Sequence, residues 1–175
     1  LQLMNCNNPE VSEKEYLKII YFKTAMLFRA TCAIPAILSN QSSETISACA
    51  NFGGHIGTAF QLTDDLLDYN GTENDIGKKL GDDLREGKAT LPLIRLLAIG
   101  DDSTTNMLKK IIVDPEGAPF DRIVELIKQS DAIEYTRKKA LRECNFAEAC
   151  LENFDETDAK KELIKLISFV HTRKG

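Results

Sequence analysis

The chain has 175 residues, of which 43% are hydrophobic and 28% charged, and its formal net charge is −5. This length can bury a hydrophobic core within one domain. Nucleic-acid binding is not expected, because the sequence contains no basic stripe with interleaved aromatic residues. Five scattered cysteines without a Cys-x-x-Cys pair, together with only two histidines, argue against a zinc site. Unpaired cysteines and the lack of a visible signal peptide favour a reducing, cytoplasmic compartment.

One stretch near the N-terminus imitates a membrane span: residues 19–38, IIYFKTAMLFRATCAIPAIL. Lys23 and Arg29 lie within it, and each charge costs about 2.5–3.5 kcal/mol at the centre of a bilayer. Pro35 interrupts the stretch further. We therefore interpret it as a buried helix of a soluble helical protein.

The fold class predicted from the sequence is all-α, since sustained strand alternation is absent. Ser12 and Glu15 form a capping-box pattern that opens a helix running to about Leu38. Ser42 or Ser43 caps a second helix that runs to about Tyr69. Further helical segments are expected at about residues 91–98, 102–113, 120–129, 131–153 and 156–171. Between them, residues 70–90 form a long polar loop of the kind that is usually functional or disordered.

The second predicted helix ends in an acidic stripe. Gly57, Gln61, Asp64, Asp65 and Asp68 are spaced three and four residues apart, which places them on one helical face. Like charges at these spacings repel, and the C-terminal end of a helix disfavours anions. Carboxylates without a nearby histidine or cysteine suit Mg²⁺, which takes one or two carboxylates plus phosphate oxygens and waters. A solvated acidic helix end is the alternative.

Lysines follow the stripe in the polar loop. Lys78 and Lys88 could contact phosphate oxygens as point charges, although mixed charge in a loop is more often solvated surface. Lys23 interrupts an apolar helix and points either outward or into a polar cavity. An EF-hand starting at Asp68 is excluded, because its sixth position is Glu73 instead of glycine and its twelfth is Lys79. Three mid-helix glycines indicate close helix packing or ligand approach: Gly53, Gly54 and Gly57.

These segments resemble the all-trans polyprenyl diphosphate synthase family. The run FQLTDDLLD at residues 60–68 and the loop GKKLGDDLREGKATLP at residues 77–92 look like its second aspartate-rich motif and the loop that follows. The segment YFKTAMLF at residues 21–28 looks like its Lys-Thr helix. The resemblance implies an isoprenoid synthase-type helical bundle, and the complete motif is nearer to the long-chain, octaprenyl-type enzymes of quinone side-chain synthesis.

The resemblance also implies roles for individual residues. Asp64, Asp65 and Asp68 would hold Mg²⁺ bridged to the allylic diphosphate, and Asp82 would support this metal shell and the loop. Other matched positions would contact the diphosphate or line the site near the developing cation: Lys23, Thr24, Gln61, Lys78 and Lys88. The reaction implied is condensation of isopentenyl diphosphate onto an allylic diphosphate by an Mg²⁺-dependent transferase.

The family's first aspartate-rich motif has no counterpart in residues 1–175. We therefore interpret the chain as the C-terminal half of a single synthase domain, inactive by itself and homodimeric within a longer parent, with peripheral membrane association through its product. A non-catalytic partner subunit of a heteromeric synthase is the alternative. A terpene cyclase of similar fold is a poorer match, because of the GKKLGD loop and its Thr-Leu-Pro exit.

Overall fold

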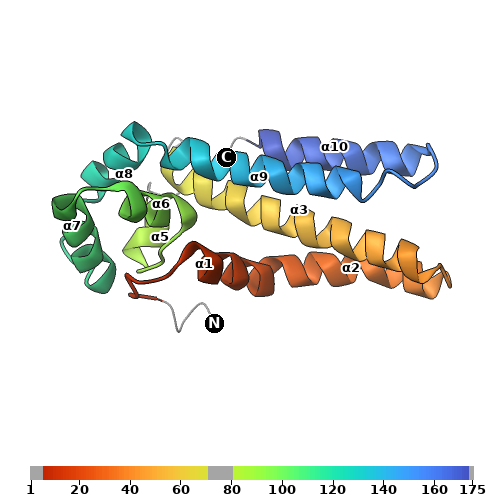
Figure 1. Ribbon diagram of the computed structural model, residues 1–175, viewed down its shortest axis with the longest axis horizontal. Coiled ribbons are helices and arrows are strands. Elements are labelled where there is room, and N and C mark those ends of the chain that lie inside the picture. Colours follow the sequence, from red (N-terminus) through yellow and green to blue (C-terminus); the bar gives the residue numbers. More distant parts are fainter. Residues whose placement is uncertain (1–5, 71–80, 174–175) are drawn as a thin grey trace. The chain divides into compact units, whose positions relative to one another are not determined.

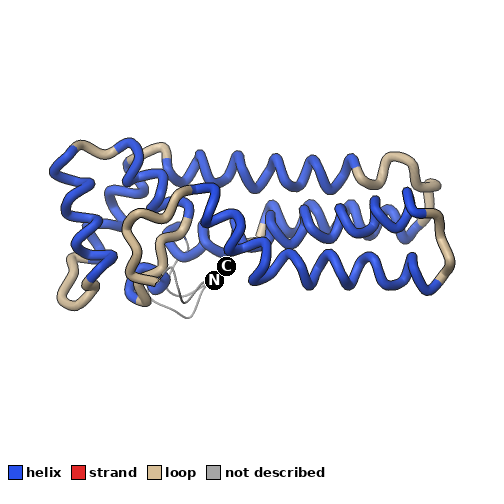
Figure 2. The backbone as a smooth tube through the Cα atoms, turned by 60° about the horizontal axis from the view of Figure 1, so that its bottom comes forward, coloured by secondary structure: helices blue, strands red, loops and turns tan. Residues whose placement is uncertain are grey.

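The computed structural model describes residues 6–70 and 81–173, and within these ranges the chain is helical with no strand (Figures 1 and 2). The expected all-α fold class is confirmed. The elements are α1 (Glu13–Ile20), the π-helical segment η2 (Tyr21–Ala25), α2 (Met26–Leu38), α3 (Ser43–Asn70), α5 (Asp82–Arg85), α6 (Leu91–Ile99), α7 (Asp102–Val113), α8 (Phe120–Gln129), α9 (Ala132–Ala149) and α10 (Asp158–Thr172).

The described residues form two compact units. The first comprises residues 6–19, 64–70 and 81–137, and the second comprises residues 20–63 and 138–173. Each unit has its own hydrophobic core, which is a cluster of buried apolar side chains in contact with one another. In the first unit the core gathers side chains from α6, α7 and α8 around Tyr69 and Leu84. In the second unit Phe52 and Ile56 of α3 pack with apolar residues of α9 and α10.

The helix starts confirm the capping predictions. The Ser12 amide donates to a carboxylate oxygen of Glu15 at 2.9 Å, and the Glu15 amide donates to Ser12 Oγ at 3.3 Å. This reciprocal pair satisfies two amides that have no partner inside the helix. At the start of α3, Ser42 is the capping residue, since its Oγ accepts from the Thr45 amide at 3.2 Å. Local sequence patterns therefore locate both starts.

Two predicted segments differ in detail from the structure. The helix expected between Ser12 and Leu38 contains a five-residue π-helical segment, Tyr21–Ala25, which carries Lys23 and Thr24. Such segments are often found at functional sites, and no local pattern predicted this one. The loop expected at residues 70–90 includes the short helix α5, while residues 71–80 lie outside the described part of the chain.

The helix expected over residues 19–38 is present, but the expectation that it is buried is wrong for the described chain. The helical run Glu13–Leu38 has the length and apolar composition of a membrane span, yet only 22% of its most apolar window is buried. A core helix of a soluble protein passes the same test of length and composition. The exposed face of this run carries the large apolar side chains Phe22, Met26, Leu27, Ile34, Ile37 and Leu38. Pro35 does not break the helix, which continues to Leu38.

The three mid-helix glycines of α3 have different surroundings. A Cβ added at Gly53 would lie 2.3 Å from the backbone oxygen of Phe28, and one added at Gly57 would lie 2.6 Å from Ala25 Cα. The same addition at Gly54 meets no atom closer than 4.0 Å. Gly53 and Gly57 therefore permit the close approach of α3 to η2 and α2, whereas Gly54 does not serve this purpose.

Alanine substitutions at two of these positions should have opposite effects. We expect Gly53→Ala to lower the free energy of unfolding by about 1–3 kcal/mol, because backbone atoms must move to admit the methyl group. Gly54→Ala should raise it by up to about 1 kcal/mol, because alanine favours the helix and its methyl group meets no atom closer than 4.0 Å. Urea unfolding followed by circular dichroism measures both values, and equal effects at the two positions would contradict this packing.

The exposed apolar face of α2 should drive association of the isolated chain. Sedimentation velocity over a wide concentration range should show oligomers, and Leu27→Lys combined with Leu38→Lys should reduce them. Val113→Lys is the matched control, because Val113 is an aliphatic side chain of α7 with 54% exposure, outside this face. A clean monomer at all concentrations would contradict the expectation.

Candidate functional site

Helix α3 is continuous from Ser43 to Asn70, so it carries all three predicted carboxylates at helical spacing near its C-terminal end. Their environments differ. Asp64 is exposed, Asp65 is only 3% exposed, and Asp68 is half-buried. A buried carboxylate is stable only when hydrogen bonds replace its lost hydration. The structure supplies different partners for the two less exposed carboxylates.

Asp65 is held by a tyrosine of α1. The buried hydroxyl of Tyr16 donates a short hydrogen bond to Asp65 Oδ2. Burial, followed by the nearby Asp65 carboxylate, raises the pKa of Tyr16 well above its ordinary value, so the hydroxyl keeps its proton and acts as the donor. No local sequence pattern predicted this contact, because Tyr16 and Asp65 are 49 residues apart.

Asp68 binds the first turn of α5. Its two carboxylate oxygens accept the amides of Asp82 at 3.1 Å and Asp83 at 3.2 Å. Its backbone oxygen also accepts the Gly81 amide at 2.8 Å, and Gly81 has a left-handed φ of 77°, which favours glycine. Asp68 thus connects the end of α3 to the start of α5. Asp82, predicted to support the metal shell and loop, meets Asp68 through its backbone amide.

The surroundings of Asp68 contain more negative charge than these amides balance. Burial, together with the neighbouring Asp83 carboxylate, raises the pKa of Asp68 from 3.8 to about 6, although the two amide bonds oppose the rise. A half-buried carboxylate with a raised pKa gains stability when a cation approaches. Raised values of this kind are common at functional sites, where charge is concentrated for binding.

Lys88 is bonded to two carboxylates near Asp68. Its ammonium donates to Asp83 Oδ1 at 3.1 Å and also contacts Glu86 Oε2. Burial lowers the pKa of Lys88, but the bonds to Glu86 and Asp83 outweigh that effect and raise the pKa above its ordinary value. The ammonium is therefore charged at neutral pH. A diphosphate would have to compete with these two carboxylates for it.

A hydrogen bond joins the two segments of the second unit that the sequence singled out. Thr24 Oγ1 donates to Gln61 Oε1 at 2.9 Å, linking η2 to α3 across 37 residues of sequence. Gln61 is buried, and Lys23, the neighbour of Thr24, is exposed. The structure therefore brings Thr24 and Gln61 together, and it places Lys23 where its ammonium reaches solvent.

The donor set limits what kind of cation could bind. Among residues 6–70 and 81–173, no three acidic, histidine or cysteine side chains are grouped as an ion-binding set. A bound cation would take one or two of the carboxylates at the end of α3, and its other ligands would come from a phosphate group and waters. Mg²⁺ binds in this way, and it suits oxygen ligands of this type. The residues present therefore fit this ion better than a fully protein-enclosed metal.

Two residues of this region were not among the predicted site residues: Tyr16 and Asp83. Asp83 contributes an amide to Asp68 and a carboxylate to Lys88. The Asp82-Asp83 pair can be read from the sequence, but the hydrogen-bond partners of its amides and carboxylates cannot. The predicted Lys78 lies outside the described residues.

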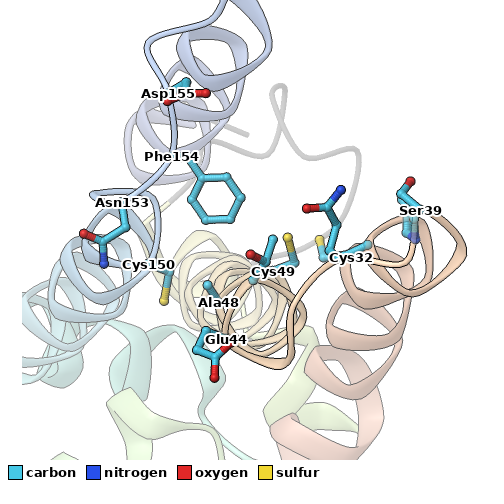
Figure 3. A pocket seen from close by; sticks show the side chains of 13 residues that line it. Cys32, Ser39, Glu44, Ala48, Cys49, Cys150, Asn153, Phe154 and Asp155 are labelled. Carbon is cyan, nitrogen blue, oxygen red and sulfur yellow. The ribbon is translucent and has the colours of Figure 1, made fainter.

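A separate pocket of about 540 Å³ lies at one end of the second unit. It is formed by the end of α2, the start of α3 and the segment between α9 and α10, and Figure 3 shows Cys32, Cys49 and Cys150 around it. Burial raises the pKa of each of these thiols, which lowers their reactivity. No predicted site residue lines this pocket.

Comparison with known proteins gives concordant results. A family model described as "Polyprenyl synthetase" matches residues 1–129. Octaprenyl diphosphate synthase of Escherichia coli K12 is 38% identical over 95% of this chain and 52% of its own length. A short chain isoprenyl diphosphate synthase of Methanothermobacter thermautotrophicus is 33% identical over 94% of this chain and 51% of its own length.

The solved structures agree. A polyprenyl synthase of Caulobacter crescentus, crystallised with calcium and isoprenyl diphosphate, has a TM-score of 0.93 at 36% identity, and the match covers 99% of this chain and 54% of that one. The chain thus spans about half the length of the curated relatives it matches. Motifs, helical fold and similarity lead to one conclusion: the chain belongs to the polyprenyl synthetase family.

Proposed function

We propose that this chain is the part of a chain-elongating trans-prenyl diphosphate synthase that binds the allylic diphosphate through Mg²⁺. The observation that carries the proposal is the acidic end of α3, where Asp64 is exposed and the pKa of the half-buried Asp68 is raised to about 6. This concentration of negative charge favours a divalent cation. The Thr24–Gln61 bond supports the proposal, because it joins two of the three segments on which the resemblance rests.

Each group has a distinct task in this proposal. Asp64 offers a solvent-accessible carboxylate to the cation, while Asp65 and Asp68 add charge from positions fixed by their hydrogen bonds. When bound, Mg²⁺ neutralises the diphosphate and so stabilises the charge that develops on this leaving group.

The cationic and neutral side chains complete the arrangement. Lys88 exchanges its bonds to Asp83 and Glu86 for diphosphate oxygens, and Lys23 and Lys78 add further positive charge. The resemblance assigns Thr24 and Gln61 to the surroundings of the allylic carbon. Departure of the diphosphate breaks the allylic C–O bond and leaves an allylic cation. The double bond of isopentenyl diphosphate attacks this cation to form the new C–C bond, and a proton is then lost to the released diphosphate.

The complete protein in this proposal is a homodimer that makes a long polyprenyl diphosphate for a quinone side chain, in the cytoplasm. The octaprenyl synthase among the relatives supports a long product, although the short-chain relative carries similar segments. A non-catalytic partner subunit has less support, since such a subunit would have no need for crowded carboxylates. Product formation by the complete protein distinguishes the two.

The direct test is turnover by the complete synthase with Mg²⁺, farnesyl diphosphate and labelled isopentenyl diphosphate. Asp64→Asn should reduce turnover by about 100-fold or more, because the accessible carboxylate loses its charge while the shape is kept. Asp102→Asn is the control, since Asp102 is an exposed carboxylate in the first turn of α7. Near-normal activity of Asp64→Asn would contradict the assignment of the cation site.

The raised pKa of Asp68 predicts a pH dependence of stability in metal-free buffer. The folded protein binds a proton at Asp68 more tightly than the unfolded protein does, because the pKa is about 6 instead of 3.8. The contribution of Asp68 to the free energy of unfolding is therefore fully present below about pH 4 and is lost as the pH rises past about 6. The free energy of unfolding, compared with that of Asp68→Asn, should decrease over this range.

Urea unfolding with a chelator present, at several pH values, measures this difference between the two proteins. Loss of the amide contacts in Asp68→Asn adds an offset that does not depend on Asp68 protonation. A difference that is constant, or that grows with pH, would contradict the charge environment described for Asp68.

A further inference from the structure

Tyr16 has no task in the function proposed above, yet its hydroxyl is the hydrogen-bond donor that contacts Asp65. The side chain is 3% exposed, and the carboxylate it contacts is equally buried. A buried carboxylate oxygen needs a donor, and a donor of fixed position also fixes the plane of the carboxylate. The contact therefore fixes the direction of the Asp65 carboxylate.

The position of Tyr16 is itself set by several contacts within the first unit. The Ser12–Glu15 capping box begins α1 immediately before Tyr16, whose amide donates to the Ser12 backbone oxygen at 2.9 Å. Glu13 of the same turn accepts from the Tyr135 hydroxyl at 2.6 Å.

A third helix supports this anchor. Arg95 lies over the Tyr135 ring, with 4.6 Å between its Cζ atom and the ring centroid. The same guanidinium forms a bidentate interaction with Asp131, in which Nε donates to Oδ1 at 2.9 Å and Nη2 donates to Oδ2 at 2.6 Å. Helices α6 and α9 thus hold α1 in place. The Tyr16 side chain is therefore fixed at one end by the backbone of α1 and at the other by the hydrogen bond of its hydroxyl to Asp65.

We propose that Tyr16 is a positioning residue that orients the Asp65 carboxylate for the divalent cation. This inference rests on the cation site of the proposed function and assigns to that site a residue from a different helix. Tyr16 acts through Asp65 and does not itself touch the cation. Groups that orient metal ligands in this way typically change metal affinity by about 10- to 100-fold when removed.

The chain contains a matched control for the substitution. Tyr69 is also buried in the first unit, with 0% exposure, but its hydroxyl accepts a hydrogen bond from Thr90 Oγ1 at 3.1 Å. Tyr16→Phe and Tyr69→Phe each remove one buried hydroxyl and keep the ring. A purely structural effect of losing a hydroxyl should therefore be similar in the two variants.

The experiment measures binding of Mn²⁺ to the 175-residue chain by electron paramagnetic resonance of the free ion, without substrate or turnover. We expect Tyr16→Phe to weaken Mn²⁺ binding by about 10-fold or more and Tyr69→Phe to leave it unchanged. In an Asp65→Asn background, Tyr16→Phe should cause no further loss, because Tyr16 acts only through this carboxylate.

The outcomes separate the two proposals. In one outcome, the unsubstituted chain binds Mn²⁺ and Asp64→Asn weakens this binding. If Tyr16→Phe then binds Mn²⁺ as tightly as the unsubstituted chain does, the role of Tyr16 is overturned and the cation site stands. Equal losses in both tyrosine variants also overturn that role. If the unsubstituted chain does not bind Mn²⁺, or Asp64→Asn has no effect, the cation site fails and the role of Tyr16 fails with it.

A second measurement needs no substitution at Tyr16 and so does not depend on the folding of a variant. Carbon-13 labelling at the ζ position of tyrosine reports the hydroxyl environment of each ring by nuclear magnetic resonance. Addition of Mg²⁺ should shift the Tyr16 resonance and leave that of Tyr69 in place. An unchanged Tyr16 resonance under conditions where Mn²⁺ binds would overturn the proposal.

Discussion

Repulsion between carboxylates at the end of α3 is the constraint around which the first unit is arranged. Water is only partly available there, so fixed donors compensate the charge: the Tyr16 hydroxyl at Asp65 and two α5 amides at Asp68. Lys88 balances Asp83. The Tyr16 bond and the two amide bonds also hold α1, α3 and α5 together, because each joins two helices. Charge that would otherwise destabilise the fold thus determines how its elements connect.

The compensation is incomplete, and the proposed cation site rests on this. Asp68 keeps a raised pKa of about 6 although both of its oxygens accept amides. A fold selected for stability alone could replace such a group by an uncharged one of similar shape at little cost. Retention of this charge in a half-buried position is the physical basis for proposing a cation here.

Local features of the structure were predictable from the sequence, and long-range ones were not. The Ser12–Glu15 pair and Ser42 act within one helical turn, so a short pattern located both helix starts. The Tyr16–Asp65 contact depends on the path of the whole chain, and the pattern around Tyr16 is that of any amphipathic helix. Gly53 and Gly54 look alike in sequence, but only the structure shows that Phe28 lies against one of them. The π-helical turn at Lys23 and Thr24 changes which side chains share a face without changing composition.

The three carboxylates of the motif are therefore not equivalent, although their spacing is regular. Asp64 faces solvent, Asp65 is oriented by a phenol, and Asp68 is occupied by the backbone of α5. An ion that takes one or two carboxylates and completes its shell with phosphate and water needs no closed protein cage. Asp68 can therefore order the start of α5 while it contributes its charge to the same site. Lys88 lies three residues after the end of α5 and bonds to Asp83 of that helix. The hydrogen bonds by which Asp68 holds α5 therefore also help to place the Lys88 ammonium, which we propose contacts the diphosphate.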